Sequence, residues 1–286
     1  NEKRRRYAGS VPDKNYSLTF TGDTADPTLG SGPTGDHVIT TFNPNEFNLN
    51  LGFTISYWVK PNDRGATMFC IGRKYNNNQR FVFGINQRNQ IYAGIGGNKL
   101  TKTFRNLGVP VPYDNLEEES GKWCIRTDQW YHFVFTYGDR TDTSSGAIRN
   151  AYINGVHVHG NDVGGGGLGN INWSQTGGEF ADDGLYFGAR NILYSGGLPG
   201  YNNGWACILD EVAIYDTAKD SDWVSDVYNG ATDYDHTDAT KSDRPSGGSQ
   251  RGLVGYWKFN EGSGTTVKDY SGNGNHGTFA PISGDT

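Results

Sequence analysis

The chain has 286 residues, with 25 lysine and arginine side chains against 31 aspartate and glutamate side chains, so its formal net charge is −6. This acidic balance argues against a nucleic-acid-binding protein, which needs excess basic groups to neutralise phosphates. Aromatic residues make up 13% of the chain and glycine accounts for 42 residues, which argues against disorder and favours an all-β protein with many tight turns.

Membrane insertion and secretion signals are not expected from the sequence. No apolar stretch approaches the ~18 residues that a membrane helix needs, and the basic start of the chain has no apolar run behind it, as a signal peptide would. Cys70, Cys124 and Cys207 are an odd number at wide spacing, which fits neither a disulfide framework nor a zinc site. We interpret them as buried thiols, with a single disulfide as the alternative.

Alternating apolar and polar residues predict a series of strands. Residues 1–15 are charged and polar and are expected to form an arm, and the first strand follows at residues 16–20. Further strands are predicted, after a Gly/Asp/Pro loop, at residues 37–42, 53–61, 68–74, 80–86, 90–96, 130–138, 151–160, 184–190, 206–216 and 252–259. Much of this series recurs at the spacing typical of a β-sandwich or barrel.

Local signals also predict one hairpin turn and one helix. Asn154-Gly155 between two alternating runs is typical of a type I′ turn. Trp223, Val224, Val227 and Tyr228 form a helical stripe behind a cap at position 220 or 221, which predicts a helix of about two to three turns. Residues 162–173 and 191–205 are glycine-rich and are expected to be loops.

The order of these motifs resembles that of the laminin G-like, concanavalin A-like jelly-roll family. The resemblance rests on residues 16–23, 53–61, 129–138, 151–158, 185–190 and 208–229, which follow the order of the family. It implies an all-β fold, a concanavalin A-like (laminin G-like) β-sandwich jelly roll of two antiparallel sheets with one short helix. This fold serves lectins, glycosidases, adhesion modules and structural proteins alike, so function has to be argued from the site.

The last part of the chain resembles the piece that normally opens such a domain, although here it follows the body. We predict an N-terminal arm (1–15), a jelly-roll sandwich (16–229), a polar linker (230–250) and a C-terminal tail (251–286). The tail is expected to supply edge strands to this sandwich or to a neighbouring copy, because an unpaired strand exposes a sticky edge. The alternative is the start of a truncated second repeat.

The layout of body, linker and tail is also similar to that of structural proteins of marine bacteriophages. This similarity implies a location on the virion surface or outside the cell. It further implies other virion proteins, or copies of the same chain, as partners.

Acidic residues in the first long loop suggest a structural calcium ion. The candidate ligands are Asp23, Asp26 and Asp36, together with Asp210, which stands where related domains often place a calcium ligand. Calcium prefers six to eight hard oxygen ligands, which carboxylates and loop carbonyls supply. The alternative is that aspartates in a Gly/Pro loop only cap turns.

Two further clusters have structural interpretations as well. Asp269, Asn273 and Asn275 could bind a second metal ion or form a plain Asn-Gly turn, and the turn is favoured. His157 and His159 lie on one face of a predicted strand, but no third zinc ligand is evident from the spacing, so a surface or packing role is favoured.

Sugar binding needs aromatic faces for stacking and amides for hydroxyl groups, displayed on loops. Two glycine-rich loops meet this requirement, and the candidate residues are Trp173, Tyr194, Tyr201, Asn202, Asn203 and Trp205. The alternative is that some of these aromatic residues close the ends of the core. The expected ligand is a glycan on a cell surface.

Catalysis is not expected. Retaining glycosidases on this jelly roll carry an acid and a nucleophile on one strand face, as Glu, apolar, Asp, apolar, Glu, and no such string occurs. Asp210 and Glu211 are adjacent, which predicts opposite faces of a strand, and Glu117–Glu119 are expected to form a solvated loop. We therefore expect a non-enzymatic carbohydrate-binding or adhesion module of a phage particle. A purely structural virion protein is the alternative, and a glycoside hydrolase is the least favoured.

Overall fold

The computed structural model describes most of the predicted strands, the helix and the C-terminal part of the chain. The described residues are 17–21, 36–43, 52–61, 66–72, 80–85, 91–95, 128–137, 149–160, 185–188, 190–193, 199–202, 206–230, 236–237 and 252–280. For strands β4, β5, β6, β11 and β12, only the backbone pairing is described.

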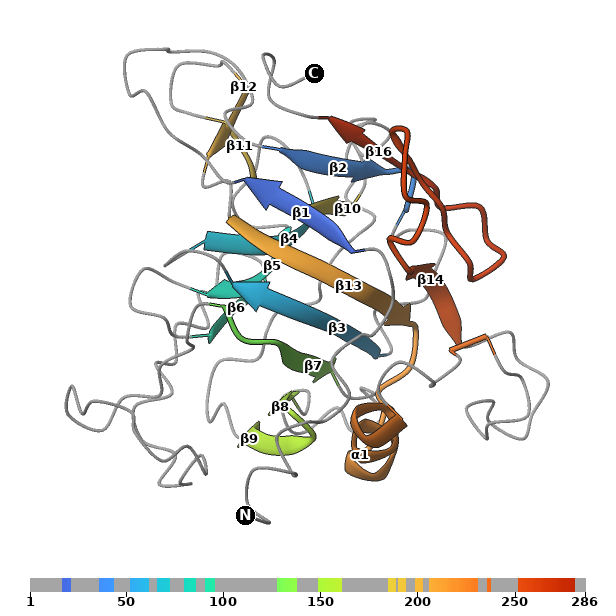
Figure 1. Ribbon diagram of the computed structural model, residues 1–286. Helices are drawn as coiled ribbons and strands as arrows, with labels where there is room; N and C mark the ends of the chain where they lie inside the picture. Colours follow the sequence, from blue (N-terminus) through green and yellow to red (C-terminus); the bar gives the residue numbers. More distant parts are fainter. Residues whose placement is uncertain are drawn as a thin grey trace.

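The described elements are strands, apart from one helix, and they follow the chain as Figure 1 labels them. They are β1 (Leu18–Thr21), β2 (His37–Thr40), β3 (Phe53–Pro61), β4 (Ala66–Gly72), β5 (Arg80–Ile85), β6 (Ile91–Ile95), β7 (Tyr131–Tyr137), β8 (Arg149–Ile153), β9 (Val156–Gly160), β10 (Leu185–Phe187), β11 (Arg190–Leu193), β12 (Pro199–Asn202), β13 (Ala206–Tyr215), α1 (Ser221–Gly230), β14 (Leu253–Trp257), β15 (Thr266–Val267) and β16 (Gly277–Ala280). The expected all-β fold with one short helix is confirmed.

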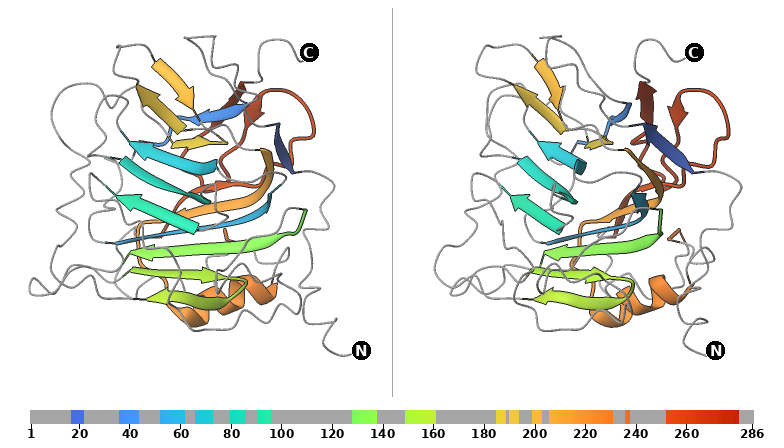
Figure 2. Two further views of the ribbon diagram at one scale, coloured as in Figure 1. Left: turned by 90° about the vertical axis from the view of Figure 1, so that its left-hand side faces the viewer. Right: turned by 60° about the vertical axis from the view of Figure 1, so that its left-hand side comes forward.

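Two antiparallel sheets, each of 7 described strands, form the sandwich. The first sheet has the order β1-β13-β3-β7-β8-β9, with β14 also paired to β13, and the second has the order β15-β16-β2-β10-β4-β5-β6. Figure 2 shows these two layers from the side. Some neighbours are consecutive in sequence, such as β8 and β9 or β5 and β6, whereas β1 pairs with β13 and β16 pairs with β2. Such long-range pairs are expected for a jelly roll.

Aromatic residues join the two layers. Trp257 of the first sheet has its ring centroid 5.2 Å from that of Phe187 in the second sheet, and Phe20 of β1 lies 6.3 Å from Phe279 of β16. Within the first sheet, the rings of Tyr57 and Phe133 are 5.6 Å apart. These side chains fill the interior between the sheets, where burial of apolar area is the main stabilising term.

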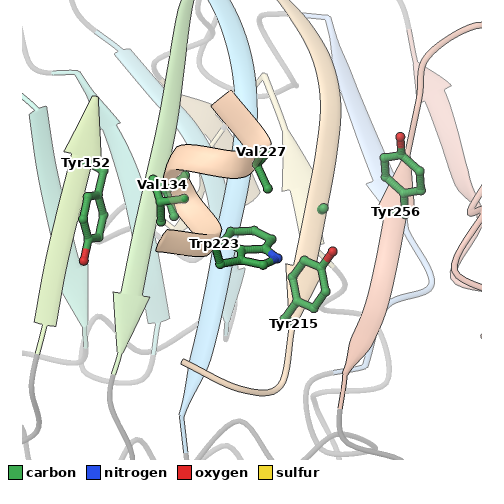
Figure 3. Packing of buried hydrophobic residues seen from close by; sticks show 8 residues of the cluster. Val134, Tyr152, Tyr215, Trp223, Val227 and Tyr256 are labelled. Atoms are coloured by element: carbon green, nitrogen blue, oxygen red, sulfur yellow. The ribbon is translucent and has the colours of Figure 1, made fainter. Parts of the chain in front are cut away.

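Helix α1 covers the outer face of the first sheet and forms a second apolar cluster there. Figure 3 shows the helix lying across the strands, with its buried side chains directed at them. The cluster consists of Val134, Tyr152, Ala213, Tyr215, Trp223, Val224, Val227 and Tyr256. The helix begins where the sequence predicts, because Asp220 Oδ1 accepts a hydrogen bond from the N–H of Trp223 at 2.9 Å.

Polar residues of β3 are buried beneath this helix and its connection to β13. Thr54 Oγ1 donates to the carbonyl of Thr217 (2.8 Å) and accepts from the N–H of Lys219 (2.9 Å). Ser56 Oγ lies 2.8 Å from His132 Nε2, and Trp58 stacks on Tyr228 of α1 at 5.9 Å. Strand β3 is therefore buried on both faces, although its alternating sequence is typical of a half-buried strand.

The predicted type I′ turn is confirmed between β8 and β9. Asn154 and Gly155 have φ values of 51° and 75°, as both central positions of this turn require. The side chain of Asn154 accepts the N–H of His132 at 2.8 Å, and a Cβ on Gly155 would lie 3.0 Å from the ring of Tyr228. The turn thus packs against both β7 and α1.

The prediction that residues 191–205 form a loop is partly wrong. Within this segment, β11 and β12 pair with each other as an antiparallel ribbon outside both sheets. The backbone of a glycine-rich segment can still pair when its strands meet in register, and the alternation rule misses strands this short.

Cys207 is a buried free thiol, as expected, while Cys124 lies outside the described residues.

Candidate functional site

The β11–β12 ribbon carries two of the predicted glycan-binding residues. Its register pairs Asn191 with Tyr201 and Arg190 with Asn202. Strand β11 contacts β10 and β4 of the second sheet, and Figure 2 shows the ribbon beside these strands, outside the two layers. Backbone pairing fixes positions 201 and 202 on an element that belongs to neither large sheet.

The other predicted glycan-binding residues cannot be placed on this ribbon. Trp173, Tyr194, Asn203 and Trp205 lie outside the described residues. In sequence, Tyr194 directly follows β11 and Asn203 directly follows β12, while Trp205 directly precedes β13. Their grouping with Tyr201 therefore stays a prediction.

The predicted calcium ligands are only partly described. Asp36 is buried just before β2 in the second sheet, and Asp210 is buried within β13 in the first sheet. Asp23 and Asp26 lie outside the described residues. No group of three or more His, Cys, Asp or Glu side chains positioned to hold a metal ion occurs in the described part of the chain. The calcium site stays a prediction.

Asp210 and Glu211 do not follow the strand alternation that the sequence suggested. The register of β13 against β3 shifts between Asp210 and Ala213, and Glu211 has a φ of 49°, which is unusual for a residue other than glycine. This β-bulge interrupts the alternation. Both carboxylates are buried, with exposed fractions of 1% and 3%, and Asp210 Oδ1 accepts the N–H of Glu211 at 2.9 Å.

The bulge directs Glu211 into a polar cluster at the edge of the α1-covered face. Tyr256 of β14 donates its hydroxyl hydrogen to Glu211 Oε2, and Tyr215 OH lies 2.7 Å from His236 Nδ1. The rings of His236 and Tyr256 are 4.8 Å apart. This cluster joins β13, β14 and residue 236, and strand alternation alone could not have predicted it, because it depends on the bulge.

His132 is a fully buried titratable group on this face. It is enclosed by Ser56, Trp58 and Tyr228, with ring centroids 5.1 and 6.1 Å from those of Trp58 and Tyr228. Its Nδ1 has no hydrogen-bond partner. Burial lowers the pKa of His132 from 6.5 to about 3, because the charged form loses its hydration. The ring is therefore neutral at physiological pH and serves packing.

The side chains of Asp269, Asn273 and Asn275, where a turn was favoured over a second metal site, form hydrogen bonds within the chain. The carboxylate of Asp269 accepts four: Oδ1 from the N–H groups of Tyr256 (2.9 Å) and Ser271 (2.8 Å), and Oδ2 from Ser271 Oγ (2.8 Å) and the N–H of Asn275 (2.8 Å). Asn275 and Asn273 donate to the carbonyl of Val254 at 2.9 and 3.1 Å. These contacts support the turn interpretation.

His157 lies on the surface of β9 and bonds to a neighbouring strand. Its Nε2 is 3.0 Å from Asn150 Oδ1, and its ring is 5.0 Å from that of Tyr152. The side chain of His159 is not described. These contacts agree with the packing role that the spacing favoured.

Among the described residues, no helix is both long enough and apolar enough to cross a bilayer. The Glu117–Glu119 run and the N-terminal arm lie outside the described residues.

Comparison with protein families gives one match. The family model described as the concanavalin A-like lectin/glucanases superfamily matches residues 32–225. The match covers the body of the sandwich from β2 into α1. No curated protein sequence matches the chain.

Several solved structures are similar to the chain at low sequence identity. A crystal structure of a candidate carbohydrate-binding protein from Bacteroides ovatus has a TM-score of 0.50 at 16% identity, covering 93% of this chain and 61% of that protein. The heptameric SAP-like pentraxin of Limulus polyphemus has a TM-score of 0.42 at 15% identity, covering 74% of this chain and 82% of the pentraxin. A structure of botulinum neurotoxin type C, whose cell entry depends on interaction with two ganglioside molecules, has a TM-score of 0.40 at 13% identity. The match covers 74% of this chain and 42% of the toxin chain.

Proposed function

The chain belongs to the concanavalin A-like lectin/glucanases superfamily, and from this membership we propose that it is a non-enzymatic carbohydrate-binding module. The observation that carries the proposal is the β11–β12 ribbon, which stands outside both sheets and holds Tyr201 and Asn202. An aromatic ring and an amide on a supported element outside both sheets are the groups that a sugar ring and its hydroxyl pairs require.

The acidic residues of β13 support binding over hydrolysis. A glycosidase needs two carboxyl groups that face the substrate from opposite sides of the scissile bond. Asp210 and Glu211 are buried, and each accepts a hydrogen bond from the protein itself. They hold the bulge and strand β14 in place, which is a structural role.

The Bacteroides ovatus protein agrees with this proposal in its described role. At 16% identity it supports the fold rather than the identity of a ligand. This chain covers 61% of that protein, so the activity of the complete relative is not transferred to it. The virion location and the phage partners stay predictions from the sequence.

A glycan array followed by calorimetry on the strongest glycan tests the proposal. Tyr201→Ala and Trp205→Ala are each expected to weaken binding at least about tenfold, because a lost stacking partner removes roughly 1.4 kcal/mol or more. The melting temperature is expected to stay within a few degrees of wild type. His157→Ala, at an exposed position on β9, is the matched control. Absence of any glycan bound by the wild-type chain would refute the proposal.

Calcium binding is proposed for the loop that contains Asp23, Asp26 and Asp36, together with Asp210. A metal ion that binds only the folded state raises stability by about 2.7 kcal/mol at a concentration one hundred times its Kd. The expected result is therefore a higher melting temperature with calcium than with a chelator. Asp26→Ala should abolish the difference and Asp226→Ala, on the exposed side of α1, should preserve it. Equal melting temperatures in calcium and chelator would contradict this proposal.

A further inference from the structure

The C-terminal segment, residues 252–280, is held together by its own hydrogen bonds. Asp269 joins the backbone of β14 to the turn at residues 271–275. Trp257 Nε1 donates to the carbonyl of Asn275 at 2.8 Å, which links the same two parts a second time. These bonds fix the parts of the docked segment relative to one another, so the segment presents β14 and β16 to the body as one piece.

This segment completes both sheets of the sandwich at once. Strand β14 pairs with Val212–Tyr215 of β13, while β1 pairs with the other half of the same edge, at residues 206–209. Strand β16 pairs with β2 along His37–Thr40. Figure 1 shows the segment on one side of the molecule, spanning the two layers. Without it, half of the β13 edge and the β2 edge would both lack a pairing strand, and unpaired edges are adhesive.

Aromatic packing makes this docking specific. Trp257 is fully buried and contacts Phe42 and Phe187 of the body, with ring centroids 6.4 and 5.2 Å away. A Cβ on Gly255 would lie 2.4 Å from the Trp257 ring, so this position accepts no larger residue without a shift. At the start of the segment, Gly252 N–H donates to Asp216 Oδ1 at 2.6 Å, and Asp216 N–H donates to the carbonyl of Gly252 at 3.0 Å.

We propose that the C-terminal segment is an exchangeable donor, which can dock on the β13 and β2 edges of a second copy of this chain. Every copy carries the same two edges and the same segment, so docking within one chain and docking between chains use identical contacts. Residues 238–251 connect the segment to the rest of the chain, and a connection of this length reaches at most about 50 Å. This inference concerns self-association and is independent of glycan binding.

Concentration decides which form of docking prevails. A short tether gives a local concentration of the order of millimolar. Docking within one chain therefore dominates in dilute solution. Docking between chains becomes comparable where copies are crowded to millimolar density, as on the surface of a regular assembly.

Single-cysteine chains test the exchange directly. Thr278 of β16 is exposed and pairs in register with the half-buried Ile39 of β2. One full-length chain carries Thr278→Cys and the other carries Ile39→Cys with a tag that changes its mass. The two are mixed at about 0.2 mM, partly unfolded in urea, refolded together and treated with a short bis-maleimide. At this concentration roughly a tenth of the segments should dock between chains, and the linker traps them as covalent heterodimers.

Matched controls separate exchange from random collision. Thr278→Cys mixed with Val156→Cys, an exposed position on β9, measures collisional cross-linking, and the unmodified chains measure the background from the native cysteines. Adding Trp257→Ala to the Thr278→Cys chain should lower the heterodimer yield several-fold. The double variant in one chain should cross-link internally.

Two results would overturn the proposal. One is a heterodimer yield equal to the Val156 control while the double variant cross-links internally. The other uses no variant: light scattering on the wild-type chain that shows only monomer up to about 1 mM, after the same unfolding and refolding. A glycan-binding monomer would leave the proposed function intact and reject this inference alone.

Discussion

His132 is buried without a compensating charge, and this makes it a pH-sensitive residue. Its Nε2 contacts Ser56 Oγ at 2.8 Å, while Nδ1 has no partner. A buried N–H without an acceptor is rarer than a buried acceptor without a donor, so the tautomer with its proton on Nε2 is favoured. The arrangement accommodates the neutral ring and disfavours the imidazolium ion.

The stability of the protein should therefore fall as the pH drops below 6.5. The pKa of His132 is about 3 in the folded chain and 6.5 in the unfolded chain, so between these values only the unfolded state binds the proton. Between pH 7.5 and pH 5, this residue should cost roughly 2 kcal/mol of unfolding free energy. Urea unfolding at both pH values checks this.

The matched variant isolates this contribution from that of the carboxylates. His132→Gln cannot titrate, so it should lose roughly 2 kcal/mol less than wild type between the two pH values. His157→Gln, on the exposed surface of β9, is the control. Equal losses for wild type and His132→Gln would show that His132 is not buried as described.

At the scale of elements, helix α1 depends on a single cap. The side chain of Asp220 accepts the N–H of Trp223, and its carbonyl accepts the N–H of Val224 at 3.1 Å. Asp220→Ala should lower the unfolding free energy by about 1 kcal/mol, and Asp220→Ser should retain most of it. Asp226→Ala, within the helix and exposed, should change it by less than about 0.5 kcal/mol. Urea denaturation followed by circular dichroism measures all three, and equal effects of the two alanine variants would contradict the capping role.

At the scale of the whole molecule, the C-terminal segment and the body share one core. Trp257→Ala removes a fully buried ring between the layers and should cost about 3–5 kcal/mol. Because the segment pairs with both sheets, unfolding should remain a single transition seen equally by circular dichroism and tryptophan fluorescence. Lys258→Ala, the half-buried neighbour, is the control. An early transition of the segment alone would show that it docks as an independent unit.

The fold was largely predictable, because its signals are local. The alternation over residues 53–61 matches the bounds of β3, the Asn154-Gly155 pair forms the predicted turn, and the stripe ending at Tyr228 lies on α1. Each signal depends on residues within one turn or one strand, which a single sequence displays.

The candidate site was less predictable. Aromatic and amide composition pointed to residues 194–205, but the pairing of Asn191 with Tyr201 depends on a register that composition does not encode. Likewise, adjacency suggested opposite faces for Asp210 and Glu211, whereas a bulge in β13 breaks the alternation. A bulge is set by the partner strand, so the sequence of β13 alone does not reveal it.

The sequence by itself determined most of the strands, where the one described helix begins, and the type of the 154–155 turn, but it missed the short strands β11, β12, β15 and β16. Only the tertiary structure decided that α1 and its connection to β13 cover Thr54, Ser56 and Trp58, and that β14 and β16 complete different sheets. The physical reason is the separation in sequence. Backbone preference and side-chain periodicity act between neighbours, whereas burial of β3 by a helix more than 150 residues away follows from packing, which depends on the three-dimensional arrangement of all the elements.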